Sequence, residues 1–177
     1  PAIIHQDIKP DNILIGPNGD FMITDFGISK QVRSTLRKSA AQVGSSGTIA
    51  YMGPEHFVNG YSPIRASDIW ALGITIYELA MGDLPFCGYG GSMLNHGADM
   101  PELPKSDFSY ELNKVMQVCL SKNTWDRPIA DKLAEYAAMK VKGLKPEPLW
   151  PEEVQAAVVD TDAPKALEVK TPIKEKP

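Results

Sequence analysis

Apolar residues come in short runs near the start of the chain and in long runs after it. The segments Ala2–Ile4, Asn12–Ile15 and Phe21–Ile23 are too short for stable helices, and their β-branched and aromatic content predicts strands. Between the last two lies Gly16–Gly19, a Gly-Pro-Asn-Gly sequence that is dense in turn-forming residues. The pattern therefore predicts a β-hairpin.

The first long apolar run predicts a buried helix. Residues 69–81 are apolar nearly all round, so we expect this helix to be covered on every side. Ser67 or Asp68 is suited to cap its beginning, and Gly82 to end it.

Three further helices are predicted downstream. One lies around Ser92–His96, and we expect it to be short or frayed because Gly88–Gly91, rich in glycine, precedes it. Tyr110–Leu120 has a regular apolar face, and Ile129–Met139 follows a turn. The fold class predicted is mainly α with a small β-hairpin.

Polar residues concentrate just before the hairpin. Pro10 is expected to prevent a helix there, which leaves a loop carrying Asp7, Lys9 and Asn12, and Asp25 follows the second strand. Asp7 is able to accept a proton, Lys9 to neutralise negative charge, and the two other residues offer hard oxygen ligands to a small dication. These groups suit phosphoryl transfer to a hydroxyl, which depends on positioning and charge stabilisation.

The sequence HQDIKPDN at positions 5–12, followed by DFG at 25–27, resembles the catalytic loop and metal-binding tripeptide of eukaryotic protein kinases. Gln6 stands where that pattern has arginine. The later sequence GTIAYMGPEHF resembles the end of a kinase activation segment, with Gly53 in place of the usual alanine of Ala-Pro-Glu. The resemblance covers residues 1–139 and implies the C-terminal lobe (α+β) of a serine/threonine protein kinase.

The resemblance implies a role for each polar residue. Asp7 would orient and deprotonate the acceptor hydroxyl, and Lys9 would stabilise the transferring phosphoryl group. Thr48 matches the threonine that bridges these two residues and, with Lys9, favours serine/threonine over tyrosine specificity. Asn12 and Asp25 would bind Mg²⁺ and, through it, ATP.

Other residues match positions that shape the kinase site. Leu14 would lie beneath the adenine ring, and a role in the core of the hairpin is an equal alternative. Asp68 would accept hydrogen bonds from catalytic-loop N–H groups, and Glu55 would form a buried ion pair with Arg127. The residues assigned structural roles in this way are His5, Phe26, Gly27, Glu55, Asp68 and Arg127.

Composition changes after residue 139. Residues 140–177 are rich in proline, lysine and glutamate, which predicts a largely disordered tail. Within it Pro151–Val159 is predicted to form a short helix, because proline and two glutamates occupy its first turn. Trp150 is expected to anchor this helix to the domain.

The overall composition bounds the class of protein. A formal net charge of -4 gives no indication of nucleic-acid binding, and the apolar run 69–77 is too short to span a membrane. Two cysteines without metal-type spacing are expected to be reduced thiols in a cytoplasmic protein. Because the chain starts at Pro1, just before the catalytic loop, we expect a fragment without the N-terminal lobe, its glycine-rich loop and its lysine.

Three functions remain open from the sequence. The leading hypothesis is an ATP-dependent kinase acting on a protein substrate, with this part alone not expected to be active. The alternative is a pseudokinase scaffold, against which the intact Asp7, Lys9, Asn12 and Asp25 count, although Gln6 is the kind of change seen in degenerate members. A small-molecule phosphotransferase is disfavoured by Lys9 and by the match at Thr48. The sequence leaves the substrate and the oligomeric state open.

Overall fold

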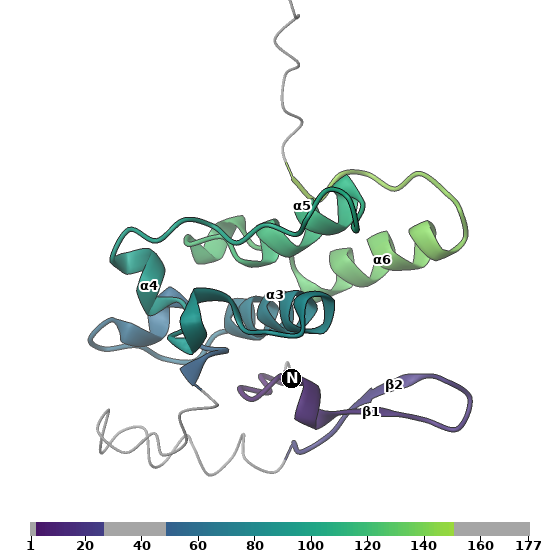
Figure 1. Ribbon diagram of the computed structural model, residues 1–177. Helices are drawn as coiled ribbons and strands as arrows, with labels where there is room; N and C mark the ends of the chain where they lie inside the picture. The colour runs from purple at the N-terminus through teal and green to yellow at the C-terminus, as the bar shows by residue number, and fades with distance from the viewer. Residues whose placement is uncertain (1–2, 27–48, 151–177) are drawn as a thin grey trace, which may run out of the picture.

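Helices are the main regular structure of the computed structural model, which describes residues 3–26 and 49–150. The elements in chain order are η1 (Pro10–Asn12), β1 (Ile13–Ile15), β2 (Phe21–Ile23), η2 (Pro54–Phe57), α3 (Arg65–Met81), η3 (Pro85–Gly88), α4 (Ser92–Asn95), α5 (Tyr110–Cys119), η4 (Thr124–Asp126) and α6 (Ala130–Val141). Figure 1 shows α3 between α5 on one side and the N-terminal loop with its hairpin on the other. The predicted fold class is confirmed.

The N-terminal region forms a two-stranded antiparallel sheet. Ile13 pairs with Ile23 and Ile15 with Phe21, so the hairpin is the one that its turn residues predict. The expectation of a strand over Ala2–Ile4 is wrong for the described Ile3 and Ile4, since the described sheet contains only β1 and β2.

The loop before the hairpin contains one turn of 3-10 helix, η1. The expectation that Pro10 prevents any helix is therefore too strict. Pro10 is the first residue of this turn, where its missing N–H would have no partner inside the helix.

Helix α3 differs from its prediction at its start and in its burial, and agrees with it at its end. It starts at Arg65 with Ile64 as N-cap and no side-chain cap, so the predicted capping by Ser67 or Asp68 is wrong. It ends as expected at Gly82, whose φ of 71° is the left-handed conformation that glycine adopts without strain. Leu79 is 68% exposed, so the helix is not covered on every side. Its fully buried residues all lie between positions 67 and 75.

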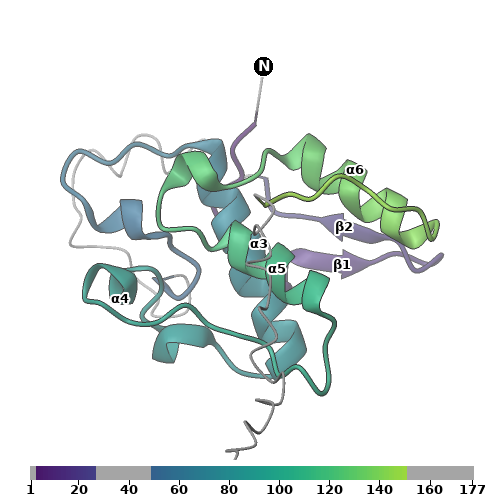
Figure 2. The ribbon, with the colours of Figure 1, turned by 90° about the horizontal axis from the view of Figure 1, so that it is seen from above.

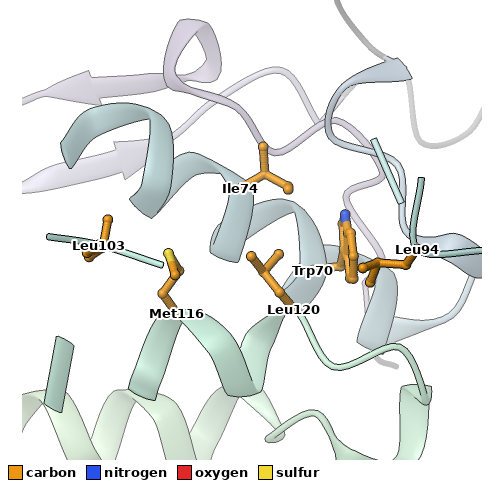
Figure 3. Packing of buried hydrophobic residues seen from close by; sticks show 6 residues of the cluster. All are labelled: Trp70, Ile74, Leu94, Leu103, Met116 and Leu120. Atoms are coloured by element: carbon orange, nitrogen blue, oxygen red, sulfur yellow. The ribbon is translucent and has the colours of Figure 1, made fainter. Parts of the chain in front are cut away.

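The hydrophobic core lies between α3 and α5 (Figure 3). Its buried members are Trp70, Ile74, Leu94, Leu103, Met116 and Leu120. The close approach of the two helices depends on Gly73, because a Cβ atom there would lie 2.8 Å from Leu120 Cδ2. Packing in this core fixes the position of α3, and α3 in turn supports the loop that precedes the hairpin.

The remaining helices are close to their predictions. Helix α4 is a single turn, as the preceding glycines suggest, and α6 extends two residues beyond the predicted end, to Val141. After α6 the chain folds back (Figure 2), and the Trp150 ring lies 5.9 Å from that of Tyr136. The expected anchoring role of Trp150 has this contact in its favour, while the helix predicted over 151–159 lies outside the described residues. Among the described residues, no helix is both long and apolar enough to cross a membrane.

Candidate active site

The loop that precedes the hairpin is fixed to α3 through its backbone. Asp68, in the first turn of α3, accepts hydrogen bonds from the N–H groups of His5 and Gln6, each at 2.8 Å. Burial raises the pKa of the Asp68 carboxyl, and the two N–H donors oppose that shift. Gln6 adopts a φ of 72°, a left-handed conformation that costs a non-glycine residue about 1–2 kcal/mol. Asp68 therefore holds the loop in a bend that it would not adopt alone.

His5 links this loop to the end of the hairpin. Its ring Nε2 lies 2.8 Å from the carbonyl oxygen of Thr24, and its Nδ1 accepts from the N–H of Asp7 at 3.3 Å. A carbonyl only accepts, so these bonds together select the neutral tautomer with the proton on Nε2. The ring also contacts Phe26 edge-on, with centroids 4.9 Å apart. The predicted structural role of His5 beside Phe26 is thus supported by two hydrogen bonds and a ring contact.

Three polar side chains of the loop meet at the Asp7 carboxylate. Asn12 Nδ2 donates to the Asp7 carbonyl at 2.8 Å and to Oδ2 of its carboxylate at 2.9 Å. Lys9 Nζ lies 3.0 Å from the same Oδ2. The Asp7 side chain is 13% exposed and so remains accessible at the surface, while Asn12 and Lys9 fix the orientation of its carboxylate through Oδ2. An oriented carboxylate with a neighbouring ammonium group is suited to accept a proton and to stabilise nearby negative charge.

The β-pairing brings the backbone that precedes Asp25 close to this group. Thr24, the residue before Asp25, donates from its N–H to the Asn12 carbonyl at 2.8 Å. Asp25 is exposed and has a φ of 64°. Because the Asn12 amide nitrogen donates to Asp7, its oxygen is the atom left as a ligand. An amide oxygen beside a carboxylate fits a hard cation such as Mg²⁺.

The described residues offer no stronger metal site. No group of three or more His, Cys, Asp or Glu is placed to hold an ion within 3–26 and 49–150. Asn12 and Asp25 would therefore supply only part of a coordination shell, as is usual for Mg²⁺ bound together with a phosphate ligand. Leu14, on β1 of the same hairpin, is 51% exposed, which does not support a role in the core of the hairpin.

An ion pair connects η2 to the segment between α5 and α6. Arg127, whose side chain is fully buried, donates to both carboxylate oxygens of Glu55 at 2.8 Å. It also donates to the carbonyls of Ser121 and Ala66, and its guanidinium group lies 5.0 Å from the Trp70 ring centroid. Burial raises the pKa of Glu55, but the bonds and charge of Arg127 outweigh it and hold that pKa below its ordinary value. The predicted Glu55–Arg127 pair is confirmed.

A hydrogen-bonded chain that the sequence did not predict extends from this pair. Ser67 Oγ donates to Glu55 Oε1, and Tyr61 Oη lies 2.9 Å from both Ser67 Oγ and His56 Nε2. His56 Nδ1 lies 3.2 Å from the carbonyl of Gly53. Ser67 therefore stabilises the start of η2 and does not cap α3. No sequence signal identified this chain, because its members have no fixed spacing.

Residues 49–54, which lead into η2 and include its first residue, lie beside the Asp7 carboxylate. A small pocket is lined by Asp7 and Gln6 together with Tyr51 and Met52. The Tyr51 hydroxyl donates to Glu78 of α3 at 2.5 Å. Burial, and then this bond and the charge of Glu78, raise the pKa of Tyr51. The segment thus forms one wall beside the candidate catalytic group.

Two residues of the predicted site, Gly27 and Thr48, lie outside the described residues, as does the segment between them. The other predicted residues fall into two groups. In and around the loop before the hairpin lie His5, Asp7, Lys9, Asn12, Leu14, Asp25, Phe26 and Asp68. Glu55 and Arg127 form the separate ion pair between η2 and the segment that joins α5 to α6.

Comparison with known proteins gives a consistent result. A family model described as a protein kinase domain matches residues 1–137. Mitogen-activated protein kinase kinase 3 of Arabidopsis thaliana is 38% identical over 139 residues, which cover 76% of this chain and 26% of that protein. Mitogen-activated protein kinase kinase 1 of the same plant is 36% identical over 149 residues, covering 78% of this chain and 41% of the relative.

A third relative carries a more specific name. The dual specificity mitogen-activated protein kinase kinase 1 of Dictyostelium discoideum is 44% identical over 99 residues, covering 56% of this chain and 14% of that protein. In these three comparisons the chain spans between 14% and 41% of the relative's length.

Proposed function

Because this chain belongs to the protein kinase family, we propose that it forms the C-terminal lobe of an ATP-dependent kinase acting on serine or threonine of protein substrates. The observation that carries this proposal is the Asp7 carboxylate, which Asn12 and Lys9 hold at 2.9 and 3.0 Å. A carboxylate oriented in this way has the geometry of a base for an acceptor hydroxyl. The proposed lobe covers residues 1–139, with 140–177 as a tail.

The proposed chemistry follows from these groups. Asp7 orients the acceptor hydroxyl and takes its proton as the hydroxyl oxygen bonds to the terminal phosphorus of ATP and the bond to ADP breaks. Lys9, beside Asp7, stabilises the negative charge on the transferring group. Asn12 and Asp25 would hold Mg²⁺, which neutralises charge on the phosphate oxygens when it is bound.

The remaining parts of the nucleotide site are proposed to come from other parts of a longer protein. Since the chain spans at most 41% of the length of the relatives described above, residues 1–177 alone are not expected to phosphorylate a substrate. A cytoplasmic location is proposed as well, because Cys87 and Cys119 are both free thiols, as in a reducing compartment.

A pseudokinase scaffold is the weaker alternative, because the four polar side chains at the site are all present and three of them are mutually bonded. The acceptor residue is a separate question. The name of the Dictyostelium relative includes dual specificity, so tyrosine must be tested beside serine and threonine. We propose serine or threonine on the basis of Lys9 and Thr48.

The test uses the full-length protein with Asp7→Asn and Asp25→Asn. Asp7→Asn is expected to abolish transfer to a peptide and leave ATP affinity nearly unchanged, since Asp7 acts on the acceptor. Asp25→Asn is expected to weaken Mg²⁺-dependent nucleotide binding. Asp20→Asn, at an exposed turn of the hairpin, is the matched control. Wild-type phosphorylation by both variants would refute the site, and the absence of phosphorylation by the wild-type protein would favour the scaffold.

Phosphoamino-acid analysis of the product settles the acceptor. Phosphoserine or phosphothreonine alone is the expected result. Phosphotyrosine in comparable amount would show dual specificity and contradict the role given to Lys9 and Thr48.

A further inference from the structure

The glycine-rich segment before α4 was expected only to weaken that helix, but it lies directly against residues 49–54. A Cβ atom on Gly90 would collide with the carbonyl oxygen of Ile49 and would lie 2.9 Å from that of Met52. A Cβ atom on Gly91 would collide with the backbone nitrogen of Pro54. Both glycines are buried. Backbone atoms cannot move aside as a flexible side-chain end does, so only glycine allows this approach.

Hydrogen bonds fix the same contact. The N–H of Gly91 donates to the carbonyl of Met52 at 2.8 Å, and the side-chain amide of Asn95, at the end of α4, donates to the carbonyl of Pro54 at 3.1 Å. Each bond satisfies a backbone carbonyl within residues 49–54. The segment 88–95 therefore holds the backbone of residues 49–54 from the side.

The opposite side of residues 49–54 faces the catalytic loop. Tyr51 and Met52 line the pocket that Asp7 also lines, and Tyr51 is bonded to Glu78 of α3. Residues 49–54 thus lie between the candidate catalytic carboxylate and the glycine-rich segment. In the proposed function, Asp7 receives the acceptor hydroxyl, so a protein substrate that reaches Asp7 would contact the neighbouring residues 49–54.

We propose that Gly90, Gly91 and Asn95 are positioning residues for substrate docking. They set the backbone of residues 49–54, and through it the affinity for the protein substrate, and take no part in binding ATP or in transferring the phosphoryl group. This inference rests on the proposed function. It predicts that changes at these positions raise the KM for the protein substrate and leave kcat and the KM for ATP close to wild type.

The experiment compares Gly90→Ala with Gly97→Ala in the full-length protein. Gly90 and Gly97 both have positive φ, 59° and 85°, so alanine strains the backbone at each. A Cβ atom on Gly97 would meet nothing within 4 Å, whereas one on Gly90 would meet the backbone of residues 49–54. The comparison therefore separates backbone strain from the contact. Asn95→Ala, which removes one hydrogen bond without adding atoms, is the milder variant if Gly90→Ala does not fold.

Gly90→Ala is expected to raise the KM for a peptide substrate by about tenfold, and Asn95→Ala by a smaller factor, with kcat and the KM for ATP unchanged. Equal effects of Gly90→Ala and Gly97→Ala would overturn the proposal. So would a fall in kcat at unchanged KM in either contact variant.

A readout independent of activity separates this inference from the proposed function. Hydrogen exchange is expected to be faster at the amides of Met52 and His56 in Asn95→Ala than in Gly97→Ala, because these amides donate to the carbonyls of Ile49 and Gly53 in the supported segment. If no peptide is phosphorylated by the wild type, the proposed function fails, and this comparison still tests the support. Unchanged exchange in Asn95→Ala would overturn the support itself.

Discussion

Arg127→Ala removes the most extensively bonded side chain in the described part of the structure. The guanidinium group makes bidentate bonds to Glu55 and donates to the carbonyls of Ser121 and Ala66, while its plane lies over Trp70. With Arg127 gone, Glu55 keeps a charge on a side chain that is only 15% exposed. Ser67 alone among its side-chain donors remains.

The expected loss of stability follows from this geometry. Breaking a buried pair by removing one partner costs about 3–5 kcal/mol, mostly as the penalty of the stranded charge. In a domain of 150–250 residues each kcal/mol lowers Tm by about 2–4 °C, so a fall of about 6–20 °C is expected. Arg127→Lys keeps the charge and loses the planar fork, so it is expected to recover part of the loss.

Thermal unfolding of the purified protein, followed by circular dichroism, measures the effect. Arg65→Ala, an exposed arginine at the start of α3, is the matched control and is expected to stay within error of wild type. The double variant Glu55→Gln/Arg127→Ala removes the stranded charge and is expected to be more stable than Arg127→Ala. A Tm within error of wild type for Arg127→Ala would refute the reasoning, and so would a double variant no more stable than the single one.

Two further predictions concern His56 and Gln6. Burial lowers the pKa of His56 from its ordinary 6.5, so near that pH the unfolded chain binds more protons than the folded one. The contribution of neutral His56 to the free energy of unfolding is therefore present above pH 6.5 and is lost as the pH falls below it. Urea titrations of wild type and His56→Gln between neutral and mildly acidic pH are expected to converge on acidification; parallel curves would contradict this. Gln6 carries no charge to bind a phosphate on the loop, so phosphatase treatment of the full-length kinase is expected to change activity little. A loss of about a hundredfold, traced to a loop serine or threonine, would show that other basic residues replace the missing arginine.

Local patterns predicted the hairpin and the positions of the long helices. The hairpin follows from turn residues between two short apolar runs, and α5 from its regular apolar face. The error at the start of α3 has a physical cause. Ser67 and Asp68 have the chemistry of capping residues, but their oxygens bond to Glu55 and to the N–H groups of His5 and Gln6. These tertiary hydrogen bonds use the side-chain oxygens that local rules would have assigned to capping the start of the helix.

Long-range contacts were predictable only where the resemblance to kinases supplied them. The Glu55–Arg127 pair joins residues 72 positions apart, and no periodicity in the sequence connects them. The contact between Asn95 and Pro54 spans 41 positions, and nothing in the resemblance indicated it. Glycines before α4 carried a local meaning, weak helix formation, which the short α4 bears out. Their second role, leaving room for the backbone of residues 49–54, can be recognised only in the folded structure.

Position 6 shows why a departure from the kinase pattern leaves the neighbouring site intact. What Gln6 contributes to Asp7 is its backbone, a left-handed bend held by the bond from its N–H to Asp68. Its side-chain nitrogen is buried and has no hydrogen-bond partner in the part of the chain that the structure describes. The bend depends on Asp68 and not on the charge of the side chain, so glutamine in place of arginine preserves the position of Asp7. The loss of charge at position 6 then affects only the binding of a loop phosphate, which an arginine would have bound. An uncharged residue here is compatible with the loop before the hairpin, because Asp68 of α3 already orders that loop.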